Sequence, residues 1–188
     1  MIARFLQTPD EMSRSSTGFS RFLYHLTGWL RCRVIRGNHG EPYLERYHLF
    51  RLPGGGGAYI HRFLDSDPDR GLHDHPWRRA LGIVLSGRYL EQRLSDEDVH
   101  ERILGPGRVN RLTRDDFHRI VPPQHRDAWT IYMQSGRNNE WGFLATTPEG
   151  VLRFTPHEKL NREGSHEGWW RSAPRGRAAD RQPLGTGA

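Results

Sequence analysis

Two histidines separated by one residue are the first feature of this sequence that could do chemistry. They lie in the segment Gly71-Leu72-His73-Asp74-His75-Pro76-Trp77. In a β-strand, residues two apart point to the same face, so His73 and His75 would present two imidazoles from one side to a single metal ion. Because the chain holds 11 histidines, the pair by itself is equally explained by two solvated imidazoles in a loop. A metal site therefore needs support from other residues.

The sequence limits what else could hold a metal or act as a nucleophile. Cys32 is the single cysteine, which excludes an internal disulfide framework, a multi-cysteine zinc site and an iron–sulfur cage. No GxSxG, GxxxxGK[ST] or HExxH segment occurs. The glycine run at 54–57 precedes an expected strand rather than a helix, so it does not indicate a phosphate-binding loop. Any metal must be held mainly by histidines and carboxylates, and Cys32 is expected to be a buried thiol.

The residues that must position such a site follow a strand pattern from Pro42 onward. Apolar and polar residues alternate there, and glycine or proline interrupts them at short intervals. Strands are expected at 43–51, 57–64, 72–75, 79–86, 88–95, 99–104, 108–113, 117–121, 128–134, 140–145 and 150–154. Strands so close in sequence leave no room for helical crossovers, which favours an antiparallel sandwich or barrel over a parallel sheet.

The two ends of the chain follow other patterns. Apolar residues recur at helical spacing at Phe19, Phe22, Leu23, Leu26, Trp29 and Leu30. They predict an amphipathic helix that ends before Gly37 and packs on the domain, within an N-terminal helical segment at 1–41. Aliphatic residues become scarce after Trp170, so a disordered tail rich in Arg, Gly and Pro is expected at 166–188. The β domain would then span 42–165.

Further residues place the histidine pair in a known pattern. Gly87 follows His75 by 12 residues at a turn between two expected strands, and His118 stands on a later short strand that Pro122-Pro123 closes. This succession resembles the cupin family, whose first motif contains HxH and a glycine and whose second motif adds a histidine. The resemblance covers residues 42–146. It implies an all-β fold, the antiparallel double-stranded β-helix of the cupin jelly-roll barrel, here with an N-terminal amphipathic helix.

The cupin resemblance also implies a set of metal ligands, namely His73, His75 and His118. The family has a glutamate ligand seven residues before the motif glycine, and here Ala80 stands at that position. The resemblance therefore points to the three-histidine variant of the site known among thiol dioxygenases. Glu91 and His61 are candidates for an additional ligand or for the pocket, and the alternative for His61 is an ordinary core or rim role. The implied cofactor is a divalent metal, expected to be Fe(II), with Zn, Mn or Ni as alternatives.

Replacement of the glutamate has a physical consequence. Three neutral imidazoles leave the charge of a divalent ion uncompensated, so the site should attract anions, and coordination positions stay open for a substrate and dioxygen. If alternation holds along 79–86, Ala80, Gly82 and Val84 face the ligands and leave room for a small molecule. Alternatively, these small residues let a bulky neighbour pack across the sheet.

Composition limits the partners. The formal net charge is +6, but basic and acidic residues are interspersed and almost every basic residue is arginine. Nucleic acid is therefore an unexpected partner, because phosphate binding needs charge gathered on one face. With no long apolar run and no signal-like N-terminus, we expect a cytoplasmic protein without a membrane partner. Cupins commonly dimerise through sheet edges, so the resemblance adds a homodimer as an expectation.

Two functions remain open. The first is a mononuclear metal enzyme, which the resemblance makes an Fe(II) oxygenase or dioxygenase acting on a small anionic molecule or a peptide side chain. A zinc or manganese isomerase or hydrolase belongs to the same class. The second is a non-catalytic cupin module that binds a metal or a small anionic ligand. The sequence identifies no catalytic acid or base, and Arg88, Arg111 and Arg119 are candidates to bind a substrate carboxylate.

Overall fold

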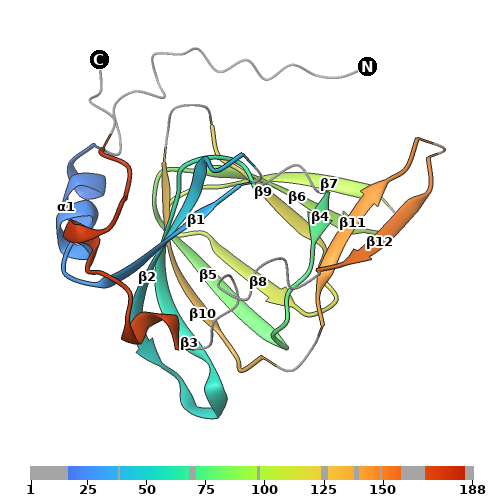
Figure 1. Ribbon diagram of the computed structural model, residues 1–188. Coiled ribbons are helices and arrows are strands. Elements are labelled where there is room, and N and C mark those ends of the chain that lie inside the picture. The colour runs from blue at the N-terminus through green and yellow to red at the C-terminus, as the bar shows by residue number, and fades with distance from the viewer. Residues whose placement is uncertain are drawn as a thin grey trace.

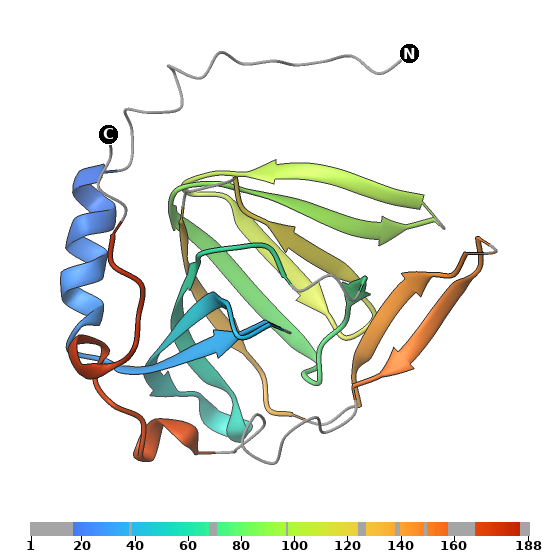
Figure 2. The same cartoon turned by 45° about the horizontal axis from the view of Figure 1, so that its top comes forward.

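Most of the protein forms two antiparallel sheets that enclose a common interior (Figures 1 and 2). The structure is a computed structural model. It describes residues 17–37, 39–67, 71–96, 98–123, 127–137, 140–148, 150–157 and 168–184. The start of the predicted N-terminal segment, residues 1–16, lies outside these ranges, as do the two ends of the predicted tail, 166–167 and 185–188.

Each sheet has six strands. The first contains, in spatial order, β1 (Arg31–Arg36), β2 (Pro42–Arg51), β3 (Gly57–Phe63), β10 (Ala128–Gln134), β5 (Arg79–Ser86) and β8 (Val109–Thr113). The second contains β12 (Leu152–Pro156), β11 (Gly142–Thr146), β4 (Leu72–His73), β9 (His118–Val121), β6 (Tyr89–Ser95) and β7 (Asp98–Leu104). Outside the sheets are α1 (Thr17–Thr27) and three short 3-10 helices, η1 (Pro53–Gly55), η2 (Trp169–Arg171) and η3 (Gly176–Ala178). Every strand predicted from the alternation of apolar and polar residues is present, so these predictions are confirmed.

The N-terminal segment differs from its prediction in two respects. The helix α1 ends at Thr27, whose hydroxyl donates to the Leu23 carbonyl at 2.7 Å, and the chain then turns and forms β1 along β2. Residues 31–36 contain the β-branched Val34 and Ile35, which favour a strand over a continued helix. The helix also rests on the sheet through Ser20, Leu23 and Thr27, which are buried. Of the predicted apolar stripe, Leu23 is therefore buried against the sheet, whereas Phe19, Phe22, Leu26 and Trp29 stay exposed.

Residues 168–184 pack against α1 and the outer face of the first sheet, so the predicted disorder is wrong for this stretch (Figure 1). The Cys32 N–H donates to the Pro174 carbonyl at 2.9 Å, and the Gly176 N–H donates to the Leu30 carbonyl at 2.8 Å. The Gln182 N–H donates to the buried Glu45 carboxylate at 2.6 Å. Composition predicted disorder because it shows few apolar residues, whereas the segment is held by polar partners far away in the sequence.

The core lies on both faces of the first sheet. One cluster fills the space between the sheets and contains Leu44, Phe63, Val84, Tyr89, Leu104, Ile120 and Ala128. A second cluster lies under α1 and contains Leu23, Cys32, Tyr47, Ile60 and Trp129. No helix in the described ranges has both the length and the apolar character needed to cross a bilayer. The interior between the sheets is where the histidines lie.

Candidate metal centre

Strands β4 and β9 bring three histidines together. His73 and His118 are direct partners in the antiparallel β4–β9 pair, so their side chains lie on the same face of the second sheet. His75 follows His73 by two residues, and its Nε2 lies 3.0 Å from the Nε2 of His118. One potential ligand nitrogen from each histidine lies within 4.8 Å of the other two. The three residues that the resemblance implied as ligands thus form one compact cluster.

Burial keeps two of these imidazoles neutral. Desolvation lowers the pKa of His73 to about 4, against the opposing influence of the Asp67 carboxylate, which raises it. Desolvation also lowers the pKa of His75 well below its usual value, and the neighbouring His73 and His118 rings lower it further. A neutral imidazole has a free lone pair on one nitrogen. At neutral pH, His73 and His75 therefore carry the protonation state that metal binding requires.

The third imidazole is fixed by a buried carboxylate. Glu91 on β6 is fully buried, and its Oε1 accepts a hydrogen bond from His118 Nδ1 at 2.8 Å. Arg102 Nε donates to Glu91 Oε2 at 2.5 Å, and Asn110 Nδ2 donates to Glu91 Oε1 at 2.6 Å. Burial raises the pKa of Glu91, but the bonds from His118, Asn110 and Arg102 outweigh it and lower the pKa to about 2. Glu91 is therefore ionised, and the proton that it holds on Nδ1 leaves Nε2 of His118 free as a ligand.

The structure places the two additional candidates outside the three-histidine cluster. Glu91 accepts a hydrogen bond from Nδ1 of His118 and is not a member of the cluster of donor atoms. His61 on β3 is buried, and its Nε2 accepts a hydrogen bond from Arg46 Nε at 3.0 Å. Its ring stacks on Tyr132 with centroids 4.8 Å apart. Burial and the Arg46 charge lower the pKa of His61, so it is a neutral member of the interior wall.

Aromatic side chains line the space beside His75. The Trp77 ring stacks on the His75 imidazole with centroids 5.2 Å apart, and Trp77 Nε1 donates to the Tyr132 hydroxyl at 2.7 Å. Burial raises the pKa of Tyr132 above its usual value, so this hydroxyl stays protonated. Because it accepts from Trp77, its own proton remains available to another acceptor.

The position of the missing glutamate faces the interior as expected. Ala80 and Val84 are buried on β5, and Ala80 packs with Tyr59, Leu112 and Tyr132. These three large side chains fill much of the space that a small residue leaves at position 80. This packing favours the alternative explanation from the sequence, in which a small residue at position 80 lets a bulky neighbour pack across the sheet.

Several residues of the site were not singled out from the sequence. Arg46, Arg102 and Asn110 all lie on strands whose alternation was recognised, but alternation does not tell which of the two faces is the inner one. Asp74, between the two histidines, accepts a hydrogen bond through Oδ1 from the Gly142 backbone N–H at 2.6 Å. It therefore ties the histidine segment to β11.

The cluster has dimensions that suit one ion. Two nitrogens that are each about 2.1 Å from one ion, at a right angle, lie about 3.0 Å apart. The Nε2 atoms of His75 and His118 are 3.0 Å apart, and all three donors are imidazoles, which suit zinc, iron, nickel and copper. The residues present therefore fit a divalent transition metal.

Two antiparallel sheets with a histidine cluster between them are consistent with a cupin-like β-sandwich. No protein-family model and no curated protein matches the sequence. Solved structures of an epoxidase and an oxidase are similar in part. Hydroxypropylphosphonic acid epoxidase from S. wedmorenis is 16% identical, with a TM-score of 0.43 over 55% of each chain. A structure of FeII HppE in complex with substrate is 17% identical, with a TM-score of 0.45 over 70% of this chain and 60% of the other.

Oxalate oxidase in complex with the substrate analogue glycolate is 18% identical, with a TM-score of 0.39 over 47% of this chain and 46% of the other. The chain spans about half the length of the first of these solved structures, at 55%.

Proposed function

We propose that His73, His75 and His118 bind one divalent metal ion, Fe(II), and that the protein is a mononuclear oxygenase acting on a small anionic molecule. The observation that carries this proposal is the cluster itself, in which three buried or half-buried imidazoles bring their donor atoms within 4.8 Å of one another. When bound, Fe(II) supplies open coordination positions for dioxygen and substrate. The fold that we assign to this function is the double-stranded β-helix, supported by the division of the strands between two antiparallel sheets.

The charge of the interior supports an anionic substrate. The three histidine donors contribute no negative charge to the ion that they would bind. Arg46 on β2 is half-buried, donates to His61 at 3.0 Å, and lies over the Tyr59 ring at 5.5 Å. Its positive charge lowers the pKa of His61 and, to a smaller extent than burial does, that of His75. We assign Arg46 the role of binding the anionic group of the substrate, with the Tyr132 hydroxyl as a hydrogen-bond donor nearby.

Metal binding provides the first test. The purified protein, loaded anaerobically with Fe(II), should hold about one ion per chain. His73→Ala, His75→Ala and His118→Ala should each lose most of it while remaining folded. His100→Ala is the matched control, because His100 is exposed on β7. Full retention of metal in two of the three variants would refute the shared site.

Oxygen consumption separates catalysis from binding. The iron-loaded protein should consume dioxygen when small carboxylates, thiol acids or phosphonates are supplied, and Arg46→Ala should raise KM more than it lowers kcat. Metal binding with thermal stabilisation by such anions, but without consumption of dioxygen, would identify a non-catalytic binding module instead.

A further inference from the structure

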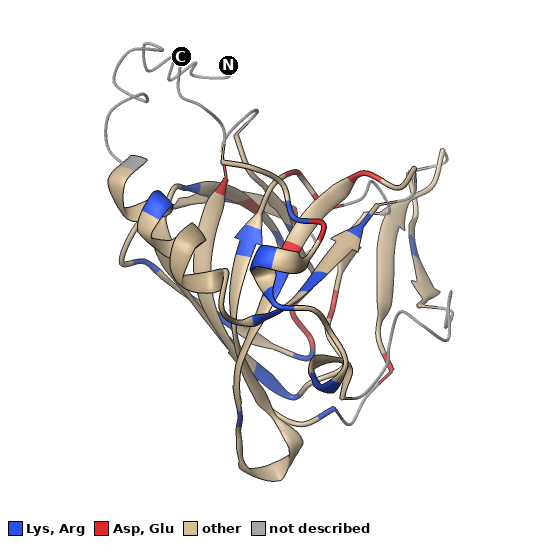
Figure 3. Cartoon of the chain, turned by 60° about the vertical axis from the view of Figure 1, so that its left-hand side comes forward, with Lys and Arg blue, Asp and Glu red and all other residues tan. Residues whose placement is uncertain are grey.

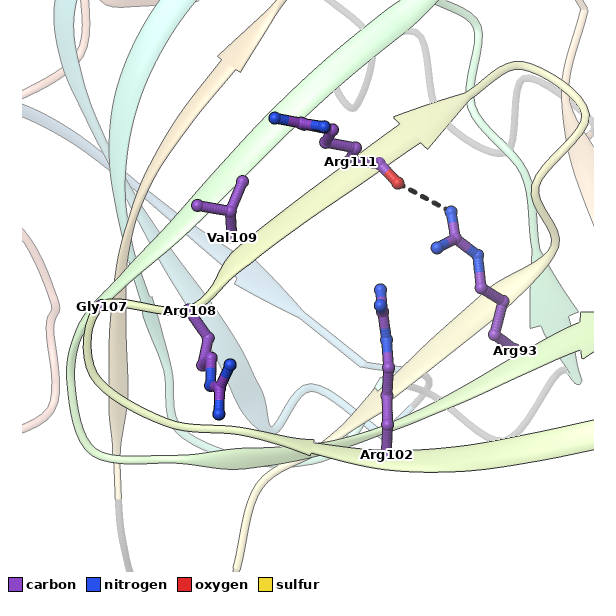
Figure 4. Close-up of a pocket in the computed structure, with 6 residues that line it drawn as sticks. All are labelled: Arg93, Arg102, Gly107, Arg108, Val109 and Arg111. Atoms are coloured by element: carbon purple, nitrogen blue, oxygen red, sulfur yellow. Dashed lines mark hydrogen bonds between the residues drawn. The ribbon is translucent and has the colours of Figure 1, made fainter.

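Four arginines line a hollow at the open edge of the two sheets (Figure 4). The strand β8 is the last of the first sheet and β7 is the last of the second, and the turn that joins them forms one side of the hollow. The hollow has a volume of about 450 Å³. Its lining residues are Arg93, Arg102, Gly107, Arg108, Val109 and Arg111.

Two of the four arginines have anionic partners. Arg93 pairs with Asp116 at 2.9 Å and donates to the Arg111 carbonyl at 2.8 Å. Arg102 pairs with Glu91 at 2.5 Å, yet 44% of its side chain remains exposed. In the described part of the chain, Arg108 and Arg111 form no ion pair. The hollow therefore carries an excess of positive charge that its own walls do not balance.

We propose that this hollow binds a small, multiply charged oxyanion, a phosphate ester or a polycarboxylate. Guanidinium groups form paired hydrogen bonds with the oxygens of both classes. A bound polyanion would balance the positive charge that the exposed Arg108 and Arg111 bring to the hollow. The volume is that of a small-molecule site, and backbone hydrogen bonds join its turn to β5. The Gly107 N–H donates to the Val84 carbonyl at 2.8 Å, and the Val84 N–H donates to the Arg108 carbonyl at 3.0 Å.

The hollow is separate from the histidine cluster but linked to it. Glu91 accepts from Arg102 through Oε2 and from His118 through Oε1. An anion that draws Arg102 toward the hollow would compete with Glu91 for the guanidinium, and Glu91 would then interact more strongly with His118. The site thus has a direct physical route to one of the proposed metal ligands. Its existence does not depend on the metal.

Calorimetric titration of the metal-free protein at low ionic strength tests the site, with pyrophosphate and citrate as probes. We expect saturable binding of at least one probe at about one per chain, and the tighter one identifies the anion class. Arg108→Ala and Arg111→Ala should each weaken it about tenfold. Arg108→Lys should restore part of the affinity, because lysine keeps the charge and loses the planar fork.

Arg153→Ala is the matched control, since Arg153 is exposed on β12, at the opposite edge of the second sheet. Thermal melting of each variant without ligand establishes that the fold is retained. The proposal is overturned if the wild-type protein binds neither probe, if the Arg108 and Arg111 variants bind as well as the wild type, or if the Arg153 variant loses as much affinity as they do.

Discussion

At the residue scale, the site depends on the different environments of the two nitrogens of His118. Nδ1 faces the ionised Glu91, and Nε2 faces His75 at 3.0 Å. A carboxylate that holds one nitrogen of a ligand imidazole fixes its tautomer and raises its basicity. Glu91 is fully buried, and three donors compensate its charge. In the proposed metal site it would therefore act on the ion through His118, as a positioning residue.

The variant Glu91→Gln tests that role. The amide cannot accept from all three donors, and its own NH₂ group opposes one of them, so the affinity for Fe(II) should fall by about 10- to 100-fold. A competition titration with a chelator measures this loss, and Glu101→Gln is the control because Glu101 is exposed on β7. A variant with a lower melting temperature but an unchanged metal affinity would show that Glu91 only stabilises the fold.

At the scale of elements, the C-terminal segment 168–184 completes the outer face of the first sheet. Arg62 is buried on β3 and pairs with Asp127 at 2.6 Å. Its Nη atoms donate to the Gln182 carbonyl at 2.6 Å and to the Pro183 carbonyl at 3.1 Å. The segment therefore satisfies a buried cation, and its Gln182 N–H satisfies the buried anion Glu45.

Truncation after Trp170 should consequently destabilise the protein. It leaves donors of Arg62 and an acceptor of Glu45 without partners in a buried setting, which costs on the order of 3 kcal/mol. For a domain of this size the melting temperature should fall by about 10 °C. Thermal unfolding measures the change, and truncation after Leu184 is the control. An unchanged melting temperature would mean that the segment contributes nothing to stability.

The elements also show where prediction from the sequence succeeds. The strands were predictable because alternation is a local property, and Gly87 was a sound turn marker because it has a φ of +72°. The three histidines could be grouped through a resemblance in motif order. The face on which α1 packs and the pairing of β1 with β2 were not predictable, because the contacts of Ser20 with Ser86 and of β1 with β2 are long-range. The hydrogen bond between Glu91 and His118 likewise depends on which strands pair, and the spacing of residues within a motif does not reveal that pairing.

At the scale of the whole molecule, the positions of the buried charged residues matter more for the sites than the net charge of the chain does. Figure 3 shows basic and acidic residues distributed over many elements of the described chain. The pair Arg62–Glu45 is buried on the outer face of the first sheet, beneath α1 and the C-terminal segment, and Glu91 is buried between the sheets. The overall charge of +6 therefore says little about the sites, which depend on local excesses such as the arginine hollow.

Buried neutral groups make the stability of the molecule sensitive to alkaline pH. Burial, together with a smaller contribution from the Glu45 carboxylate, raises the pKa of the Cys32 thiol from 9.0 to about 12. Burial also raises the pKa of Tyr89 from 10.0 to about 12. A group with a raised folded pKa contributes stability that is fully present below its unfolded pKa and is lost as the pH rises through the folded value. The free energy of unfolding should therefore decline between pH 9 and 12.

Cys32→Ala isolates the contribution of the thiol to that decline. The variant should be less stable than the wild type at pH 8, because a buried side chain is shortened, but its stability should fall less steeply above pH 9. A shift of three pKa units corresponds to about 4 kcal/mol across the window, so the two curves should converge and can cross. Urea unfolding at intervals from pH 8 to 12 measures both curves. If they stay parallel, the Cys32 thiol ionises in the folded protein as readily as in the unfolded chain, and its burial has no energetic consequence at alkaline pH.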